Sequence, residues 1–211
     1  MDKRFLAVLI IIILALGGLF IYTRSQNDSV DTTAGISNHV RYPDASGVTL
    51  MVYGDFQCSA CKPFYYLEKQ VFENFPGQIT FIFRHFPLDS IHPNARAASR
   101  AAEAASLQGQ FFEMHDMLYE NQDSWSNANQ SQAIFESYAS ALGLDLAKFK
   151  TDFASEAVND TINADKQEGE RQGVEGTPAY FLNGEKLDNS DINTVEAFSA
   201  KIEAALQNSD N

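Results

Sequence analysis

Apolar residues are spaced along the chain in patterns that predict its first elements. Residues 48–53 are a short apolar and β-branched run, typical of a strand buried on both faces. After a turn, apolar side chains recur at helical spacing from Phe64 to Phe75, until Pro76 begins a break. Residues 78–86 then read as a second strand. A strand, a helix and a strand in this order predict a right-handed parallel crossover.

The second half of the chain predicts mostly helices. No good strand candidate occurs from about residue 93 to 173, and five windows have helical character: 94–107, 111–119, 132–142, 146–153 and 158–171. Strand character returns over 178–182, and Asn183–Gly184 is a favoured hairpin turn before residues 185–187. A last amphipathic helix has four apolar residues on one face: Val195, Phe198, Ile202 and Leu206. The fold class is α/β, with a helical insert of about 80 residues.

The N-terminus has the pattern of a membrane anchor. Lys3 and Arg4 precede an unbroken apolar run over residues 5–22, which would reach about 27 Å as a helix. A bilayer core is about 30 Å thick, so the run just spans it. We expect residues 1–4 to form a cytoplasmic stub, since positive charge stays inside, and all later residues to be extracytoplasmic. No Ala-x-Ala follows the run, which favours a retained anchor over the alternative, a cleaved signal.

Composition and charge narrow the function of the rest. Residues 23–41 are small and polar, and we interpret them as a flexible tether to one domain over residues 42–211. The chain has 28 acidic and 15 basic residues, a net charge of -13. A nucleic-acid surface needs a basic stripe, so we expect no nucleic-acid partner.

The two cysteines, Cys58 and Cys61, are three residues apart where the first helix is predicted to begin. Backbone amides and the helix dipole would stabilise a thiolate on the leading cysteine, so we expect Cys58 to be acidic and exposed and Cys61 to be the buried resolving thiol. A structural disulfide in so short a loop would stabilise the fold little. Half a zinc site is the other alternative, but there is no further cysteine, and the four histidines lack a zinc-finger spacing: His39, His85, His92 and His115. We expect redox chemistry, with no metal and no cofactor.

Five segments resemble the DsbA-like thiol-disulfide oxidoreductases of the thioredoxin superfamily, in the order of that family. They are Tyr53–Cys61, Phe83–Leu88, His92–Ala95, Phe111–Asp116 and Gly176–Phe181. The resemblance covers roughly residues 42 to 207 and implies a thioredoxin fold with a helical insert at about 93–173. It also implies that Thr177–Pro178 forms a cis-proline loop packed against the disulfide, which presents backbone groups to an extended substrate peptide. His85, His92 and His115 lie in these segments and are expected to be architectural.

The chain departs from the family at two places. The family often has a buried acidic residue six positions before the first cysteine, where it assists proton transfer to the resolving thiol, and here that position is Val52. The active-site loop between the cysteines is Ser59–Ala60, which has no histidine beside Cys58. The redox potential of the relatives is therefore not carried over.

The resemblance and the predicted anchor together imply an extracytoplasmic disulfide donor. Its expected partners are thiol-containing exported proteins and, for re-oxidation, a quinone-linked membrane oxidoreductase. A disulfide isomerase or reductase of the same fold is the first alternative. A non-catalytic peptide-binding or chaperone-like domain is the second.

Overall fold

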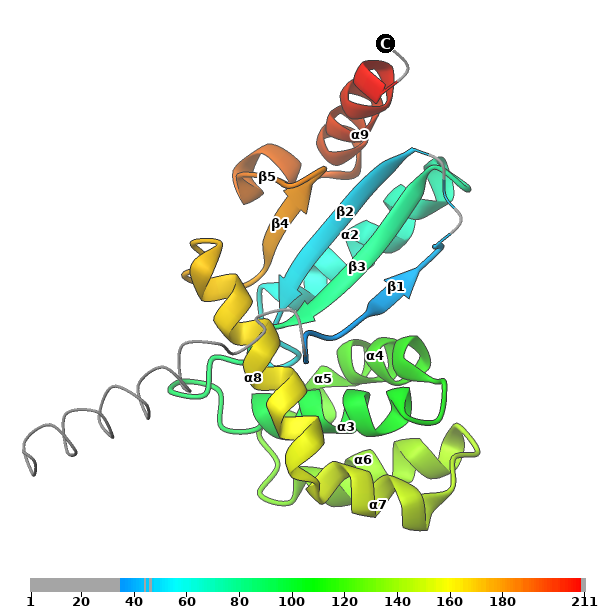
Figure 1. The fold of residues 1–211 in the computed structure, drawn as a ribbon, viewed down its shortest axis with the longest axis vertical. Helices are drawn as coiled ribbons and strands as arrows, with labels where there is room; N and C mark the ends of the chain where they lie inside the picture. Colours follow the sequence, from blue (N-terminus) through cyan, green and yellow to red (C-terminus); the bar gives the residue numbers. More distant parts are fainter. Residues whose placement is uncertain (1–34, 44, 46, 210–211) are drawn as a thin grey trace, which may run out of the picture. The chain divides into compact units, whose positions relative to one another are not determined.

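A computed structural model of the chain describes residues 35–43, 45 and 47–209 (Figure 1). The predicted stub and anchor, and the tether as far as residue 34, lie outside these residues. Within the described ranges, no helix is both long enough and apolar enough to span a bilayer.

A five-stranded mixed sheet carries the site, in the order β1-β3-β2-β4-β5 (Figure 1). Its strands are β1 (His39–Arg41), β2 (Val48–Gly54), β3 (Ile79–His85), β4 (Ala179–Leu182) and β5 (Glu185–Lys186). β2 and β3 are parallel, with Leu50 opposite Phe81 in register, and the other pairs are antiparallel. The parallel crossover and the hairpin at Asn183–Gly184 are as predicted, and both turn residues have positive φ.

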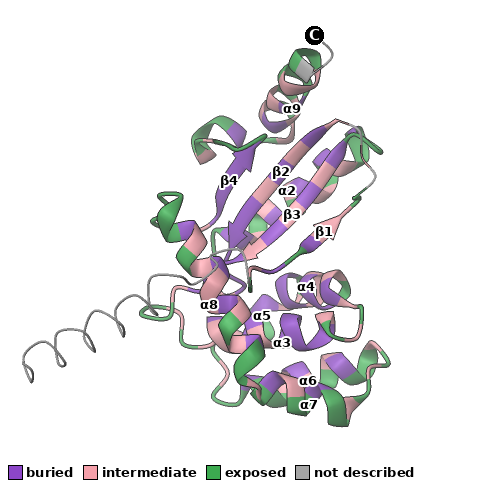
Figure 2. Cartoon of the chain, in the orientation of Figure 1, coloured by how far each residue is buried: buried purple, intermediate pink, exposed green. Residues whose placement is uncertain are grey.

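Helices cover both faces of the sheet, which explains why its central strands lack a polar face. Figure 2 shows β4 buried along its length; β2 alternates between buried and half-buried residues as far as Val52 and is buried from there to Gly54. Leu50, Phe81 and Tyr180 share the main core with α2 (Cys61–Asn74) and α9 (Val195–Ser209). On the opposite face, Tyr53 and Phe181 form a smaller aromatic cluster, beside α8 (Glu156–Arg171).

The predicted helical insert is confirmed; α8 runs back along the sheet, and the other helices of the insert lie beyond the carboxyl ends of β2 and β3 (Figure 1). Besides α8 they are α3 (Ala95–Ser106), α4 (Phe111–Glu120), α5 (Gln122–Trp125), α6 (Ser131–Ala141) and α7 (Leu146–Ala154). The five predicted windows match five of these helices to within a few residues. α5 was missed because a single turn has no periodicity to detect.

The fold begins earlier than the sequence predicts. The predicted tether runs to residue 41, but His39–Arg41 forms β1, which pairs with β3. Just before it, the backbone N–H and hydroxyl of Ser37 both donate hydrogen bonds to the Asp165 carboxylate, 2.8 and 2.6 Å long. These buried contacts to α8 order a segment that has too few apolar residues to be recognised as part of a core.

Gly169 sets how closely α8 approaches the sheet. A Cβ at this position would lie 2.7 Å from the Phe86 ring and 3.0 Å from the Tyr53 ring. Both rings are buried, so they have little room to move. The glycine is therefore required by packing, although glycine inside a helix costs about 1 kcal/mol relative to alanine.

We predict that Gly169→Ala lowers the free energy of unfolding by about 1–3 kcal/mol, the usual cost of overpacking. Urea denaturation of the full chain measures it. Gly176→Ala is the control, because a Cβ at residue 176 would meet no atom within 4 Å. A Gly169→Ala variant as stable as the wild type would show that helix propensity outweighs the packing.

Candidate active site

The two cysteines lie in the connection from the central strand β2 to the helix α2. A turn after Gly54 is closed by the backbone N–H of Cys58, which donates to the Asp55 carbonyl oxygen over 3.1 Å. The N–H of Cys61 donates in turn to the Cys58 carbonyl oxygen, also over 3.1 Å. The sequence predicts that the helix begins at the cysteine pair. In the structure Cys61 is the first residue of α2, and Cys58 lies in the turn before it.

The loop before β4 packs against Cys58. The peptide bond between Thr177 and Pro178 is cis, as the resemblance implies. The protonated Cys58 thiol donates a weak hydrogen bond to the Thr177 carbonyl oxygen, with the sulfur 3.4 Å from it. An open groove of about 420 Å³ runs past Thr177 and Pro178 towards Asn189. The Asn189 amide donates a hydrogen bond to the Pro178 carbonyl oxygen over 2.8 Å and so holds the loop in place.

Cys58 is acidic in this setting. The Cys61 thiol is the main cause, because it donates a hydrogen bond that stabilises the Cys58 thiolate; burial opposes this, while the Thr177 side chain and the backbone N–H groups of Cys61 and Ala60 add to it. Together they lower the pKa of Cys58 to about 5. The Thr177 hydroxyl is buried and makes no hydrogen bond of regular geometry, so its effect on the pKa of Cys58 comes from its position near the sulfur. Backbone amides contribute as predicted, but the neighbouring thiol contributes more.

The two sulfurs differ less in exposure than in acidity. Cys58 is 7% exposed and Cys61 3% exposed, so the prediction that Cys58 is exposed is wrong, whereas Cys61 is buried as predicted. Burial, followed by the hydrogen bond to Cys58 and the negative charge of its thiolate, raises the pKa of Cys61 well above its ordinary value. Ser59 and Ala60, between them, are exposed. One thiol is therefore ionised at neutral pH while its neighbour holds its proton.

Hydrogen bonds from polar side chains, one of them on the insert, fix the cysteine loop. The Gln122 amide, on α5, donates to the carbonyl oxygens of Phe56 and Cys58 over 2.7 and 2.9 Å. The buried Asp55 carboxylate accepts hydrogen bonds from the backbone N–H of Gln57 and from His92, both 2.7 Å long. Sequence reasoning missed Gln122, because its one-turn helix is 64 residues from Cys58 and no local pattern connects them.

A family profile described as thioredoxin matches residues 39–204. This chain belongs to the thioredoxin family. The match begins at β1, which agrees with the early start of the fold.

Curated relatives share part of their length with this thioredoxin domain. The Na(+)/H(+) antiporter NhaA 1 of Salinispora arenicola is 36% identical over 169 residues, which are 80% of this chain and 25% of the antiporter. The NhaA 1 of Mycolicibacterium gilvum is 35% identical over 153 residues, 71% of this chain and 24% of that protein. The chain therefore spans about a quarter of the length of these relatives.

Solved structures with DsbA-type folds are similar to most of this domain. BdbD from Bacillus subtilis, in its oxidised form, has a TM-score of 0.68 at 20% identity, covering 80% of this chain and 92% of BdbD. Wolbachia pipientis alpha-DsbA1 has a TM-score of 0.65 at 20% identity, covering 77% and 87%. At this identity the likeness concerns the fold, and it confirms the predicted thioredoxin fold with a helical insert.

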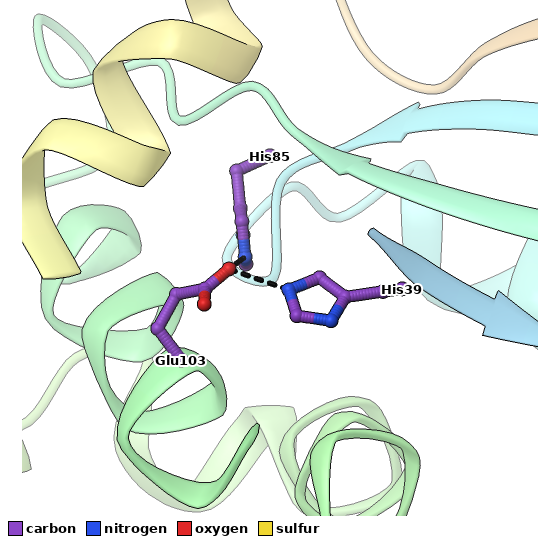
Figure 3. A group of neighbouring side chains, drawn as sticks. All are labelled: His39, His85 and Glu103. Atoms are coloured by element: carbon purple, nitrogen blue, oxygen red, sulfur yellow. Dashed lines mark hydrogen bonds and ion pairs between the residues drawn. The ribbon is translucent and has the colours of Figure 1, made fainter. Parts of the chain in front are cut away.

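Three buried polar side chains elsewhere in the domain could hold a metal ion, and the sequence did not predict them. Nε2 of His39 on β1 and Nε2 of His85 on β3 lie 2.5 and 2.8 Å from the same carboxylate oxygen of Glu103 on α3 (Figure 3). All three donor atoms lie within 4.8 Å of one another. The short distances are those of hydrogen bonds, and although burial opposes it, these bonds lower the pKa of Glu103 to about 2. The triad thus joins two strands to the insert.

The other histidines of the family-like segments also have structural partners. His92 bonds to Asp55, as described above, and His115 Nδ1 lies 2.8 Å from an Asp116 carboxylate oxygen. Burial lowers the pKa of His115 to about 4, although Asp116 raises it, so the imidazole is neutral at pH 7.

We predict that the alkylation rate of Cys58 in the reduced full chain rises with pH through a midpoint near 5. The thiolate is the reactive form, so the rate follows its fraction. Iodoacetamide labelling followed by mass spectrometry, from pH 3 to 9, measures it. Cys61→Ala removes the main hydrogen-bond donor and is expected to move the midpoint up by at least one unit. A wild-type midpoint near 8.5, the value of a free cysteine, would contradict this account of the site.

Proposed function

We propose that this chain is an extracytoplasmic thiol-disulfide oxidoreductase that donates disulfides to exported proteins through Cys58 and Cys61. The acidity of Cys58 carries the proposal. A thiolate with a pKa near 5 stabilises the reduced pair at pH 7, so the pair gains free energy when it takes electrons from a substrate. A structural disulfide would need the opposite preference.

The reaction follows from the different protonation of the two sulfurs. A substrate thiolate attacks Cys58 Sγ of the disulfide, an S–S bond forms to the substrate, and Cys61 leaves with the electron pair and takes up a proton. A second substrate thiolate then attacks the substrate sulfur of the mixed disulfide, and Cys58 leaves as a stable thiolate. The substrate is oxidised by two electrons and the pair is reduced by two.

The groove beside the cis-proline loop supports a peptide substrate. The edge formed by Thr177 and Pro178 lies next to Cys58, so a peptide along the groove would bring its own cysteine towards Cys58 Sγ. In this proposal Thr177 and Pro178 contact the substrate. Ser59 and Ala60, which are exposed between the two cysteines, form the active-site loop that the substrate approaches.

The compartment and the electron acceptor complete the proposal. A disulfide donor requires an oxidising compartment, and the apolar run over residues 5–22 would hold the domain outside the cytoplasmic membrane. Two electrons per cycle must leave the reduced pair. A quinone-linked membrane oxidoreductase in the same bilayer would take them and restore the disulfide.

We predict that the Cys58–Cys61 pair has a reduction potential at or above about −220 mV. Thioredoxin, with a thiol pKa near 7, has a potential of about −270 mV, and lowering the pKa from 7 to 5 favours the reduced form by about 50 mV at pH 7. Equilibration of the full chain with glutathione buffers measures it. The oxidised chain should also form disulfides in a reduced, unfolded substrate protein, and Cys58→Ser should not.

Three results would contradict the proposal. A potential at or below about −270 mV would favour a reductase. Substrate oxidation that persists in Cys58→Ser would favour a peptide-binding domain. In cells, a pair trapped mostly as thiols would favour an isomerase kept reduced by a partner.

A further inference from the structure

A small void lies against Cys61 inside the core. Its volume is about 10 Å³, the smallest that accepts one water molecule. Residues of three strands, two helices and the cis-proline loop enclose it, and they include Val52 of β2, Cys61 and Glu68 of α2, Tyr119 of α4 and Tyr180 of β4. The void therefore places the buried thiol of Cys61 near polar side chains inside the core.

Glu68 is the carboxyl group among the residues that line this void, and it is only 5% exposed. The Tyr180 hydroxyl donates a short hydrogen bond to its Oε1. Burial raises the pKa of Glu68 to about 8, although the bond from Tyr180 and the positive charge of Arg41 lower it. Among the described residues, no cationic side chain forms an ion pair with Glu68. A buried carboxyl without such a partner is costly, so its presence here needs an explanation.

The proposed reaction requires such a group. Each time the disulfide is reduced, Cys61 leaves as a thiolate and must gain a proton; each time it reforms, Cys61 must lose that proton. Cys61 is buried, so the proton is exchanged inside the protein. Position 52, where the family often has a buried acid, is occupied by Val52 and cannot serve.

The other titratable groups around the void are less suited to exchange a proton with Cys61. Burial raises the pKa values of Tyr119 and Tyr180 well above the ordinary value, so neither accepts a proton as tyrosinate. Tyr65 is similarly raised, and its hydroxyl donates to Glu120. His115 is neutral and already bonded to Asp116, whose negative charge also acts on Glu68.

We propose that Glu68 exchanges the proton of the Cys61 thiol through a water molecule in the void. The inference rests on the proposed thiol-disulfide exchange. When the S–S bond breaks and the electron pair goes to Cys61 Sγ, the Glu68 carboxylic acid gives its proton through the water to that sulfur. Tyr180 then stabilises the carboxylate left behind. On re-oxidation the carboxylate takes the proton back, and Cys61 attacks the mixed disulfide on Cys58.

The test separates the two chemical steps. The reduced full chain is mixed with oxidised glutathione, quenched by alkylation at set times, and followed by mass spectrometry. Appearance of the Cys58–glutathione adduct reports attack by Cys58, and its loss reports attack by Cys61. For the wild type, the rate of the second step should rise with pH and level off above pH 8.

Glu68→Gln keeps the shape and the acceptor for Tyr180 but cannot carry the proton. We expect its second step to be at least tenfold slower at pH 7, with no levelling near pH 8 and with the first step within twofold of the wild type. Glu73→Gln, an exposed position on the same helix, is the matched control and should change neither step. Tyr180→Phe removes the bond that favours the carboxylate, so its levelling point should move to higher pH.

The results distinguish the inference from the function on which it rests. A Glu68→Gln chain whose second step keeps the wild-type rate and pH profile overturns the role of Glu68. If that variant does not fold, an unshifted profile in Tyr180→Phe overturns it instead. A wild-type chain that exchanges no disulfide with glutathione overturns the proposed function itself.

Discussion

The hydrogen bond from the Cys61 thiol to the Cys58 sulfur is the interaction on which the site depends. It is the largest cause of the low pKa of Cys58, and the resulting thiolate in turn raises the pKa of Cys61. Each sulfur thus stabilises the protonation state of the other. At pH 7 the ionised Cys58 stabilises the reduced fold by about 2–3 kcal/mol relative to an unfolded thiol. This preference for the reduced pair makes the disulfide an oxidant.

The fold keeps the two sulfurs in that arrangement from three directions. The cysteine loop follows the carboxyl end of the central strand β2. The cis-proline loop before β4 packs against Cys58. From the insert, Gln122 donates hydrogen bonds to the carbonyl oxygens of Phe56 and Cys58 and so fixes the loop. The insert is therefore part of the site and more than a cover for it.

The sequence predicts those parts of the structure that are local. The Cys-x-x-Cys pair, the parallel crossover and the insert follow from spacing and periodicity, and the cis peptide at Thr177 follows from the resemblance. Gln122, Glu68 and the triad of Glu103 do not, because each is bonded to a partner tens of residues away in the chain. Glu68 in particular follows the pattern of a polar position on a helix, and only the fold shows that it bonds to Tyr180 and lines a void together with Cys61.

The stability of the reduced chain relative to the oxidised chain, measured against pH, tests the central claim most directly. The pKa of Cys58 is lower in the folded state than in the unfolded state, so its stabilisation is complete above about pH 8.5 and is lost as the pH falls towards 5. In urea denaturation of both forms, the difference should therefore grow in favour of the reduced chain by about 1.4 kcal/mol per pH unit between pH 5 and 8. A difference that does not change over this range would show that Cys58 is an ordinary thiol.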